Sequence, residues 1–155
     1  MKVEYINPFI NSLLKTFDTL IHIDLERGNP ELLRSSDLLT DNYDISGIMA
    51  LSGKATGVVI LSFSRLLALK VVSAFVGQEY LSIDDDVTDA IGELTNIIAG
   101  NAKNELPEFE MAITIPTVVQ GPNHKIRLPQ NLPFVNLPFK SKYGEMHLKL
   151  CLKIK

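Results

Sequence analysis

Asp89-Ala-Ile-Gly-Glu93-Leu-Thr-Asn96-Ile-Ile-Ala-Gly100 is the segment that decides the fold. Its apolar residues recur with the three- and four-residue spacing of an amphipathic helix, so one side of that helix is expected to be buried. The apolar side comprises Val87, Ala90, Ile91, Leu94, Ile97 and Ile98. Asp89, Glu93 and Asn96 stand at i, i+4 and i+7, so they are predicted to share the opposite, solvent-facing side.

The chemistry of this polar stripe is limited by its residue types. The Asn96 carboxamide can donate and accept hydrogen bonds but cannot act as a base near neutral pH. Its useful role is to hold a water molecule in a fixed orientation, which helps most where the electrophile is already activated, as in phosphoryl transfer. Glu93 could act as a base, but a salt bridge to a lysine or arginine of a partner is the simpler role. Asp89 extends the acidic edge.

Two glycines accompany the stripe. Gly92 lies at its margin and Gly100 on it. Glycine costs a helix about 1 kcal/mol relative to alanine, so its use here needs a reason. We hypothesise that both glycines let the backbone of a partner approach closely. No serine, histidine or cysteine nucleophile stands with these residues.

Length, composition and charge exclude several classes of protein. The 155 residues favour one domain, 1–155, with a substantial core. The formal net charge of -3 gives no support for nucleic-acid binding. No stretch resembles a signal peptide or a membrane span, so a cytoplasmic protein without a membrane role is expected. Cys151 is the single cysteine and cannot form a disulfide within the chain.

The rest of the chain predicts an α+β fold in which three helices cover one face of a largely antiparallel sheet. The helices are expected over residues 3–22, 64–76 and 84–105. Strands are expected over residues 43–51, 56–63, 111–119, 125–128, 134–140 and 145–154. Ser64 is a candidate N-cap, Pro8 would fall in the first turn of its helix, and the aspartates at 84–86 would cap the third helix. Proline among strand residues at 133 and 138 favours an edge strand or bulges.

The motif Asp89-x-x-x-Glu93-x-x-Asn96, followed by Pro116 on the next strand, resembles the signature of the CheC/CheX/FliY phosphatase family, and its CheX members in particular. That family dephosphorylates the chemotaxis response regulator CheY. Further segments with the same resemblance are residues 57–63, 68–74, 90–94, 99–100 and 116–119.

The resemblance implies a mechanism. Glu93 would pair with the active-site lysine of the phosphorylated receiver, and Asn96 would orient the water for in-line attack on the aspartyl phosphate. Asp89, Gly92, Gly100 and Pro116 would belong to the partner-binding surface. Mg²⁺ would belong to the receiver, so the chain needs no metal or cofactor of its own. A homodimer formed through the sheets is also implied.

Three alternatives remain open at this point. The chain could be a non-catalytic module that binds receivers or dimerises, although such a module has no need of the Asn96 amide. It could be a structural part of a flagellar switch, but no appended switch-type domain is evident. A second motif with the E-x-x-N spacing occurs at Glu4 and Asn7, but no Asp or Ser precedes Glu4 by four residues. The histidines at 22, 124 and 147 show no metal-ligand spacing.

Overall fold

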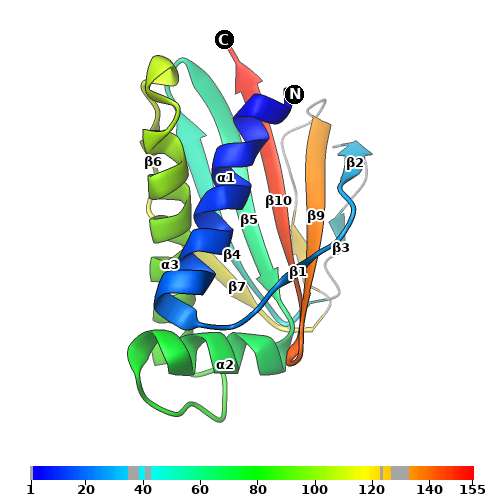
Figure 1. Ribbon diagram of the computed structural model, residues 1–155, viewed down its shortest axis with the longest axis vertical. Helices are drawn as coiled ribbons and strands as arrows, with labels where there is room; N and C mark the ends of the chain where they lie inside the picture. Colours follow the sequence, from blue (N-terminus) through cyan, green and yellow to red (C-terminus); the bar gives the residue numbers. More distant parts are fainter. Residues whose placement is uncertain (1, 35–38, 41–42, 123, 127–132) are drawn as a thin grey trace.

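A computed structural model describes residues 2–34, 39–40, 43–122, 124–126 and 133–155. Three α-helices and a one-turn π-helix lie on one side of a sheet (Figure 1). The helical elements are α1 (Val3–Thr16), the π-helix η1 (Phe17–Ile21), α2 (Arg65–Val76), α3 (Asp85–Asn104) and the 3-10 turn η2 (Pro107–Phe109). The strands are β1 (Glu26–Arg27), β2 (Glu31–Arg34), β3 (Leu39–Thr40), β4 (Ile45–Ser52), β5 (Ala55–Phe63), β6 (Ala112–Ile113), β7 (Thr117–Gln120), β8 (Lys125–Ile126), β9 (Pro133–Ser141) and β10 (Gly144–Ile154).

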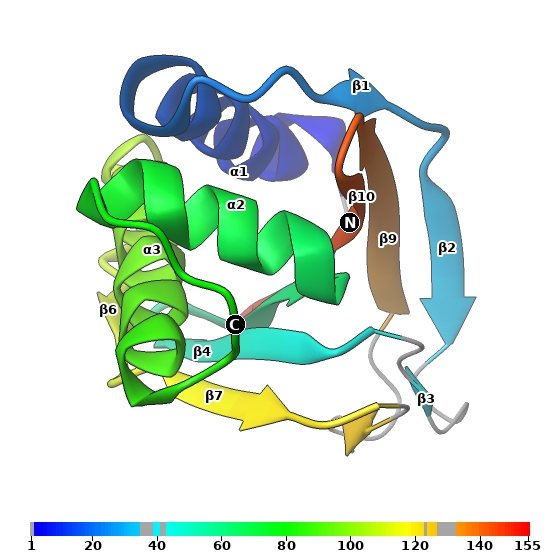
Figure 2. The same ribbon diagram turned by 90° about the horizontal axis from the view of Figure 1, so that it is seen from below.

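The main sheet runs in the order β1-β9-β10-β5-β4-β6, with β2 also paired to β9 and β7 also paired to β4. Every pairing in it is antiparallel. α1 and α3 run along the sheet, and α2 crosses one end of it (Figures 1 and 2). The predicted α+β architecture of three helices on a largely antiparallel sheet is therefore confirmed.

α3 is fixed at its start and along its buried side. The Asp84 carboxylate accepts a hydrogen bond from the Val87 N–H at 2.9 Å, which is the capping role predicted for the first aspartate. Ile91 and Leu94 are buried against the sheet. Gly47 of β4 lies beneath Thr95, where a side chain on residue 47 would collide with the threonine. The missing side chain of Gly47 lets α3 lie close to β4.

α1 packs against α3, and the Ser12 hydroxyl donates to the Ile98 carbonyl of α3 at 2.7 Å. Pro8 is buried inside the helix rather than in its first turn, because α1 begins at Val3 and Pro8 is its sixth residue. The predicted helix over residues 3–22 is continuous in extent, but its last turn is π-helical. It ends at His22, whose φ of 60° is left-handed.

Ser64 is the N-cap of α2, as predicted, although its side chain makes no capping bond and its hydroxyl oxygen is buried without a partner among the described residues. Two other local predictions differ from the structure. The strand expected over residues 111–119 is split into β6 and β7. β9 is an inner strand, so the edge-strand alternative for its prolines is wrong. Beside Pro138 the pairing is interrupted between β1 and β2, where four residue steps from Arg27 to Glu31 face three from Phe139 to Asn136, as the bulge alternative expects. Residues 127–128 of one expected strand lie outside the described residues.

The face of the sheet opposite the helices is more covered than the alternating pattern of β10 predicts. Cys151 is fully buried there in a cluster with Ile60, Ile126 and Phe134, and this burial raises the pKa of its thiol. β10 is a central strand, so Cys151 does not lie at an edge of the sheet. A polar row crosses the same face: the Ser46 hydroxyl lies 2.7 Å from the Ser62 hydroxyl and 2.7 Å from His124 Nε2.

Candidate active site

The polar stripe lies in the middle of α3, on the side turned away from the core. Asp89 and Glu93 are exposed and Asn96 is half-buried. Within the part of the chain that the structure describes, none of these three side chains makes a hydrogen bond or an ion pair. Thr95, by contrast, is buried and donates its hydroxyl to the Ile91 carbonyl at 2.8 Å. The polar groups of the stripe are thus available to another molecule, whereas the nearby hydroxyl is not.

The outer edge of the sheet runs beside this stripe and contains a β-bulge. Leu51 of β4 pairs with Ile113 of β6, and Ile48 of β4 pairs with Thr117 of β7. Three residue steps along β4 therefore face four along the outer chain, so the outer chain holds one extra residue. We call residues 114–116 the edge bulge. This extra residue explains why the expected strand over 111–119 is interrupted.

Hydrogen bonds and packing hold the edge bulge in place. The Thr114 N–H donates to the Ala50 carbonyl at 3.1 Å, and the Thr114 hydroxyl accepts from the Ala50 N–H at 3.1 Å. A Cβ on Gly92 would lie 3.5 Å from Pro116 Cγ and 3.4 Å from Val118 Cγ2. The edge bulge is therefore tied to β4 on one side and packed against α3 on the other.

The two glycines of α3 have different surroundings. Gly92 is buried, and the close approach that it allows is that of Pro116 and Val118 of the same chain. Pro116 and Val118 therefore pack beside Gly92 from within the chain, and the hypothesis that Gly92 lets the backbone of a partner approach closely stays a prediction. Gly100 is half-exposed, and a Cβ there would lie 3.7 Å from Ile113 Cδ1 and 4.0 Å from the Asn96 carboxamide oxygen. Gly100 thus leaves space next to the Asn96 amide.

The structure brings Gly92 and Pro116 together and places Asn96 one helical turn further along the same edge. Asp89 and Glu93 face outward beside them. The sequence analysis missed Thr114 and Ile115, the other two residues of the edge bulge. The signal for them was present: the apolar alternation after Met111 breaks where Ile115 and Pro116 follow one another.

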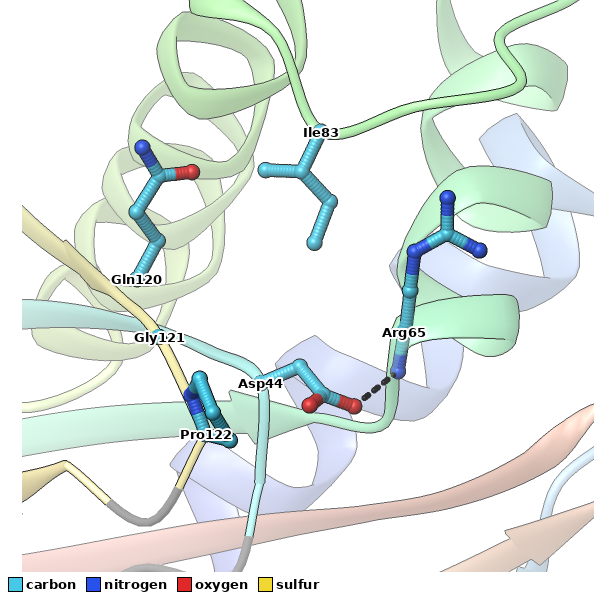
Figure 3. Close-up of a pocket in the computed structure, with 6 residues that line it drawn as sticks. All are labelled: Asp44, Arg65, Ile83, Gln120, Gly121 and Pro122. Atoms are coloured by element: carbon cyan, nitrogen blue, oxygen red, sulfur yellow. Dashed lines mark hydrogen bonds between the residues drawn. The ribbon is translucent and has the colours of Figure 1, made fainter.

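A separate cavity of about 370 Å³ lies at the N-terminal end of α3 (Figure 3). It is lined by Asp44, Arg65, Ile83, Gln120, Gly121 and Pro122. The Arg65 N–H donates to the Asp44 carboxylate at 2.7 Å, and the Arg65 guanidinium donates to the Leu81 carbonyl at 3.0 Å. These bonds fix the start of α2 and the loop that leads into α3. The described lining includes no residue of the polar stripe, so the cavity and the stripe are separate features.

Among the residues that the structure describes, no cluster of three or more His, Cys, Asp or Glu side chains could hold a metal ion. The stripe offers one carboxamide and two carboxylates without a nucleophile. Such a set can orient water and bind a cationic side chain, and it depends on another molecule to supply the electrophile.

Comparison with known proteins identifies the class to which this fold and site belong. The profile of the family described as "Chemotaxis phosphatase CheX" matches residues 45–140. The CheY-P phosphatase CheX of Thermotoga maritima is 33% identical over 130 residues, covering 82% of each chain. A CheC-like superfamily protein from Shewanella sp. PV-4 has a crystal structure with a TM-score of 0.90 and 34% identity, covering 99% of each chain.

A third relative was crystallised with its partner. The CheX–CheY–BeF3–Mg²⁺ complex from Borrelia burgdorferi contains a chain that is 25% identical and has a TM-score of 0.81, covering 98% of this chain and 99% of that one. These matches show that the present chain belongs to the CheX family of chemotaxis phosphatases. The family resemblance drawn from the helix motif is thereby confirmed. No helix in the described part of the chain is long and apolar enough to cross a membrane.

Proposed function

We propose that the protein ends chemotaxis signalling by hydrolysing the aspartyl phosphate of a CheY-like response regulator. The observation that carries the proposal is the polar stripe of α3, where Asp89, Glu93 and Asn96 face outward without partners among the described residues of a CheX-family chain. Side chains that serve the fold normally pair within it, whereas a site that acts on another protein must keep its polar groups available.

In this proposal Asn96 enters the active site of the receiver and holds the attacking water through its carboxamide. The water oxygen forms the new bond to phosphorus as the bond to the aspartyl oxygen breaks. The products are the free aspartate carboxylate and dihydrogen phosphate, which keeps the water protons. Because the chain supplies no nucleophile, its contribution is to position the water and to place a dipole near the developing charge.

Glu93 would form a salt bridge with the active-site lysine of the receiver, and Asp89 would extend the same acidic edge. Both carboxylates are exposed and stand one helical turn apart. Charge-assisted hydrogen bonds of this kind are the stronger ones and fix orientation as well as affinity. Gly100 supports the arrangement by leaving the space next to the Asn96 amide open.

The metal in this reaction would belong to the receiver. The complex from Borrelia burgdorferi contains Mg²⁺ and BeF3 together with CheX and CheY. Mg²⁺ prefers several oxygen ligands, including phosphate oxygens, and would neutralise charge on the transferred group. We also propose that the protein acts in the cytoplasm as a homodimer formed through its sheets, as the family resemblance implies.

The test is the decay of a phosphorylated CheY-like receiver from the same organism, measured with Mg²⁺ in the presence of the wild-type protein and of Asn96→Ala. We expect wild type to accelerate phosphate release and the variant to lose the acceleration while still binding the receiver. If wild type binds the receivers of the organism but accelerates the decay of none, the protein is a non-catalytic receiver-binding module and the proposed hydrolysis is wrong.

A further inference from the structure

Ile115, in the middle of the edge bulge, has an unusual environment for a large apolar side chain. Its exposed fraction is 88%, the highest among the exposed large hydrophobic side chains of the described residues. Its neighbours along the chain are engaged, because Thr114 bonds to Ala50 and Pro116 packs on Gly92. The backbone is thus held in a conformation that presents the isoleucine to solvent.

The position of Ile115 relates it to the polar stripe. Pro116, the residue after it, lies against Gly92, and Ile113, two residues before it, lies against Gly100. Gly92 and Gly100 stand one turn on either side of Asn96 on α3. The edge bulge therefore runs alongside the turn of the helix that carries the amide. A protein large enough to reach Asn96 would also cover the edge bulge.

We infer that the edge bulge is the second half of the docking surface and that Ile115 is its apolar anchor for the receiver. The inference rests on the proposed function and adds a partner contact to it. Glu93 and Asn96 provide orientation, a charge-assisted contact and chemistry, but the polar stripe offers no apolar side chain for the centre of an interface. An exposed apolar side chain on a rigid support supplies what the stripe lacks, because little conformational entropy is lost when it is covered.

The occupant that we assign is the receiver domain. The stripe carries two carboxylates, which match a partner with a lysine at its active site. A surface that combines an apolar anchor with a polar edge is typical of the centre and rim of a protein interface. β-Bulges often stand next to active sites, where they redirect a side chain, and this one redirects Ile115 away from the core.

The experiment measures receiver binding and hydrolysis for Ile115→Ala, Ile115→Asp and the conservative Ile115→Leu. The matched control is Leu32→Asp, since Leu32 is 72% exposed on β2 at the opposite side of the sheet. Binding is measured by titration with the CheY-like receiver in the presence of BeF3 and Mg²⁺. Hydrolysis is measured as KM and kcat with the phosphorylated receiver. Thermal unfolding of each variant checks that the fold is kept.

We expect Ile115→Ala to weaken binding and raise KM by about 10–100-fold, the effect of losing one buried isoleucine, while kcat at saturation is unchanged. Ile115→Asp should lose more affinity for the receiver than Ile115→Ala, and Ile115→Leu should retain most of it. Leu32→Asp should bind and hydrolyse as wild type does. If Ile115→Ala and Ile115→Asp bind as well as Leu32→Asp while wild type is active, the anchor role is wrong and the phosphatase proposal stands. If wild type neither binds nor dephosphorylates the receiver, both fail.

Discussion

α1 and α3 each carry a glutamate three residues before an asparagine, but the two motifs have different surroundings. In α3, Glu93 and Asn96 lie in the middle of a 20-residue helix and have no partner among the described residues. In α1, Glu4 is in the first turn and Lys2 lies 3.8 Å from it, and both Glu4 and Asn7 are exposed. The spacing is the same, but only the motif of α3 lies in the middle of a helix, with helical turns on both sides of it.

The second difference is what lies beside each motif. Pro116 of the edge bulge and Ile113 of β6 lie on either side of Asn96. Near the motif of α1, Tyr5 packs its ring edge-on against Phe109, with 5.1 Å between the ring centroids. Pro8, immediately after Asn7, removes the N–H that would bond back to Glu4. The two motifs therefore share a spacing but differ in helix position and in the strand beside them, and we expect only the motif of α3 to act on a receiver.

The strongest test of this comparison replaces the asparagine in each helix. Asn96→Ala should lower kcat by about 100-fold or more, because one precisely placed polar group is typically worth that much to a transition state. Asn7→Ala should leave kcat unchanged. The measurement is phosphate release from the receiver at saturating concentration. Equal losses from the two variants would show that α1 carries a second working site.

Replacing the glutamate should also affect activity only in α3, but the loss should be smaller than for the asparagine. Glu93→Gln removes the charge that we propose pairs with the receiver lysine and should lower kcat/KM by about 10–100-fold, the range for a charge-assisted hydrogen bond. Glu4→Gln should have no effect. Initial rates at low receiver concentration, repeated at two salt concentrations, measure this. If the rate of Glu93→Gln depends on salt as strongly as the rate of wild type does, the electrostatic contact belongs to Asp89 or another residue.

The close packing of α3 on β4 at Gly47 can be tested without the receiver. Gly47→Ala would push against Thr95 and should lower the free energy of unfolding by about 1–3 kcal/mol, the usual cost of overpacking. Gly100→Ala is the control, since its Cβ would meet nothing closer than 3.7 Å and should raise helix stability by up to about 1 kcal/mol. Urea denaturation reports both. A Gly47→Ala protein as stable as wild type would mean that α3 can shift on β4 at no cost.

The smallest expected effects are at the helix starts. Asp84→Ala removes the bond to the Val87 N–H and should cost about 1 kcal/mol of stability. Lys2, the N-cap of α1, makes no capping bond with its side chain, so Lys2→Ser should stabilise the protein by about 0.5 kcal/mol. Chemical denaturation of both variants measures the difference. If Lys2→Ser has no effect, the first turn of α1 is too frayed for a cap to matter.

The sequence predicts the parts of the site that depend on one helix. The periodicity of α3, the outward stripe of Asp89, Glu93 and Asn96, and the cap at Asp84 all follow from local spacing, and the structure has them as expected. The hairpin between β9 and β10 follows from Gly144, whose φ of 131° suits a glycine.

What the sequence does not predict depends on contacts between distant segments. The edge bulge is defined by the register of residues 113–117 against β4, which no local pattern encodes. β2 was not predicted because residues 31–34 lack alternation, and their strand form comes from pairing with β9. The burial of Cys151 depends on the cover that Ile126 provides from another part of the chain.

The hydrogen bond from the Ser12 hydroxyl of α1 to the Ile98 carbonyl of α3 should couple the local unfolding of the two helices. Both groups are buried, so separating α1 from α3 would break this hydrogen bond together with the apolar packing around it. The two helices should therefore open as one cooperative unit, and slow amide exchange in the middle of α3 should depend on α1 remaining docked. In this way α1 limits the local unfolding of α3, the helix that carries the polar stripe.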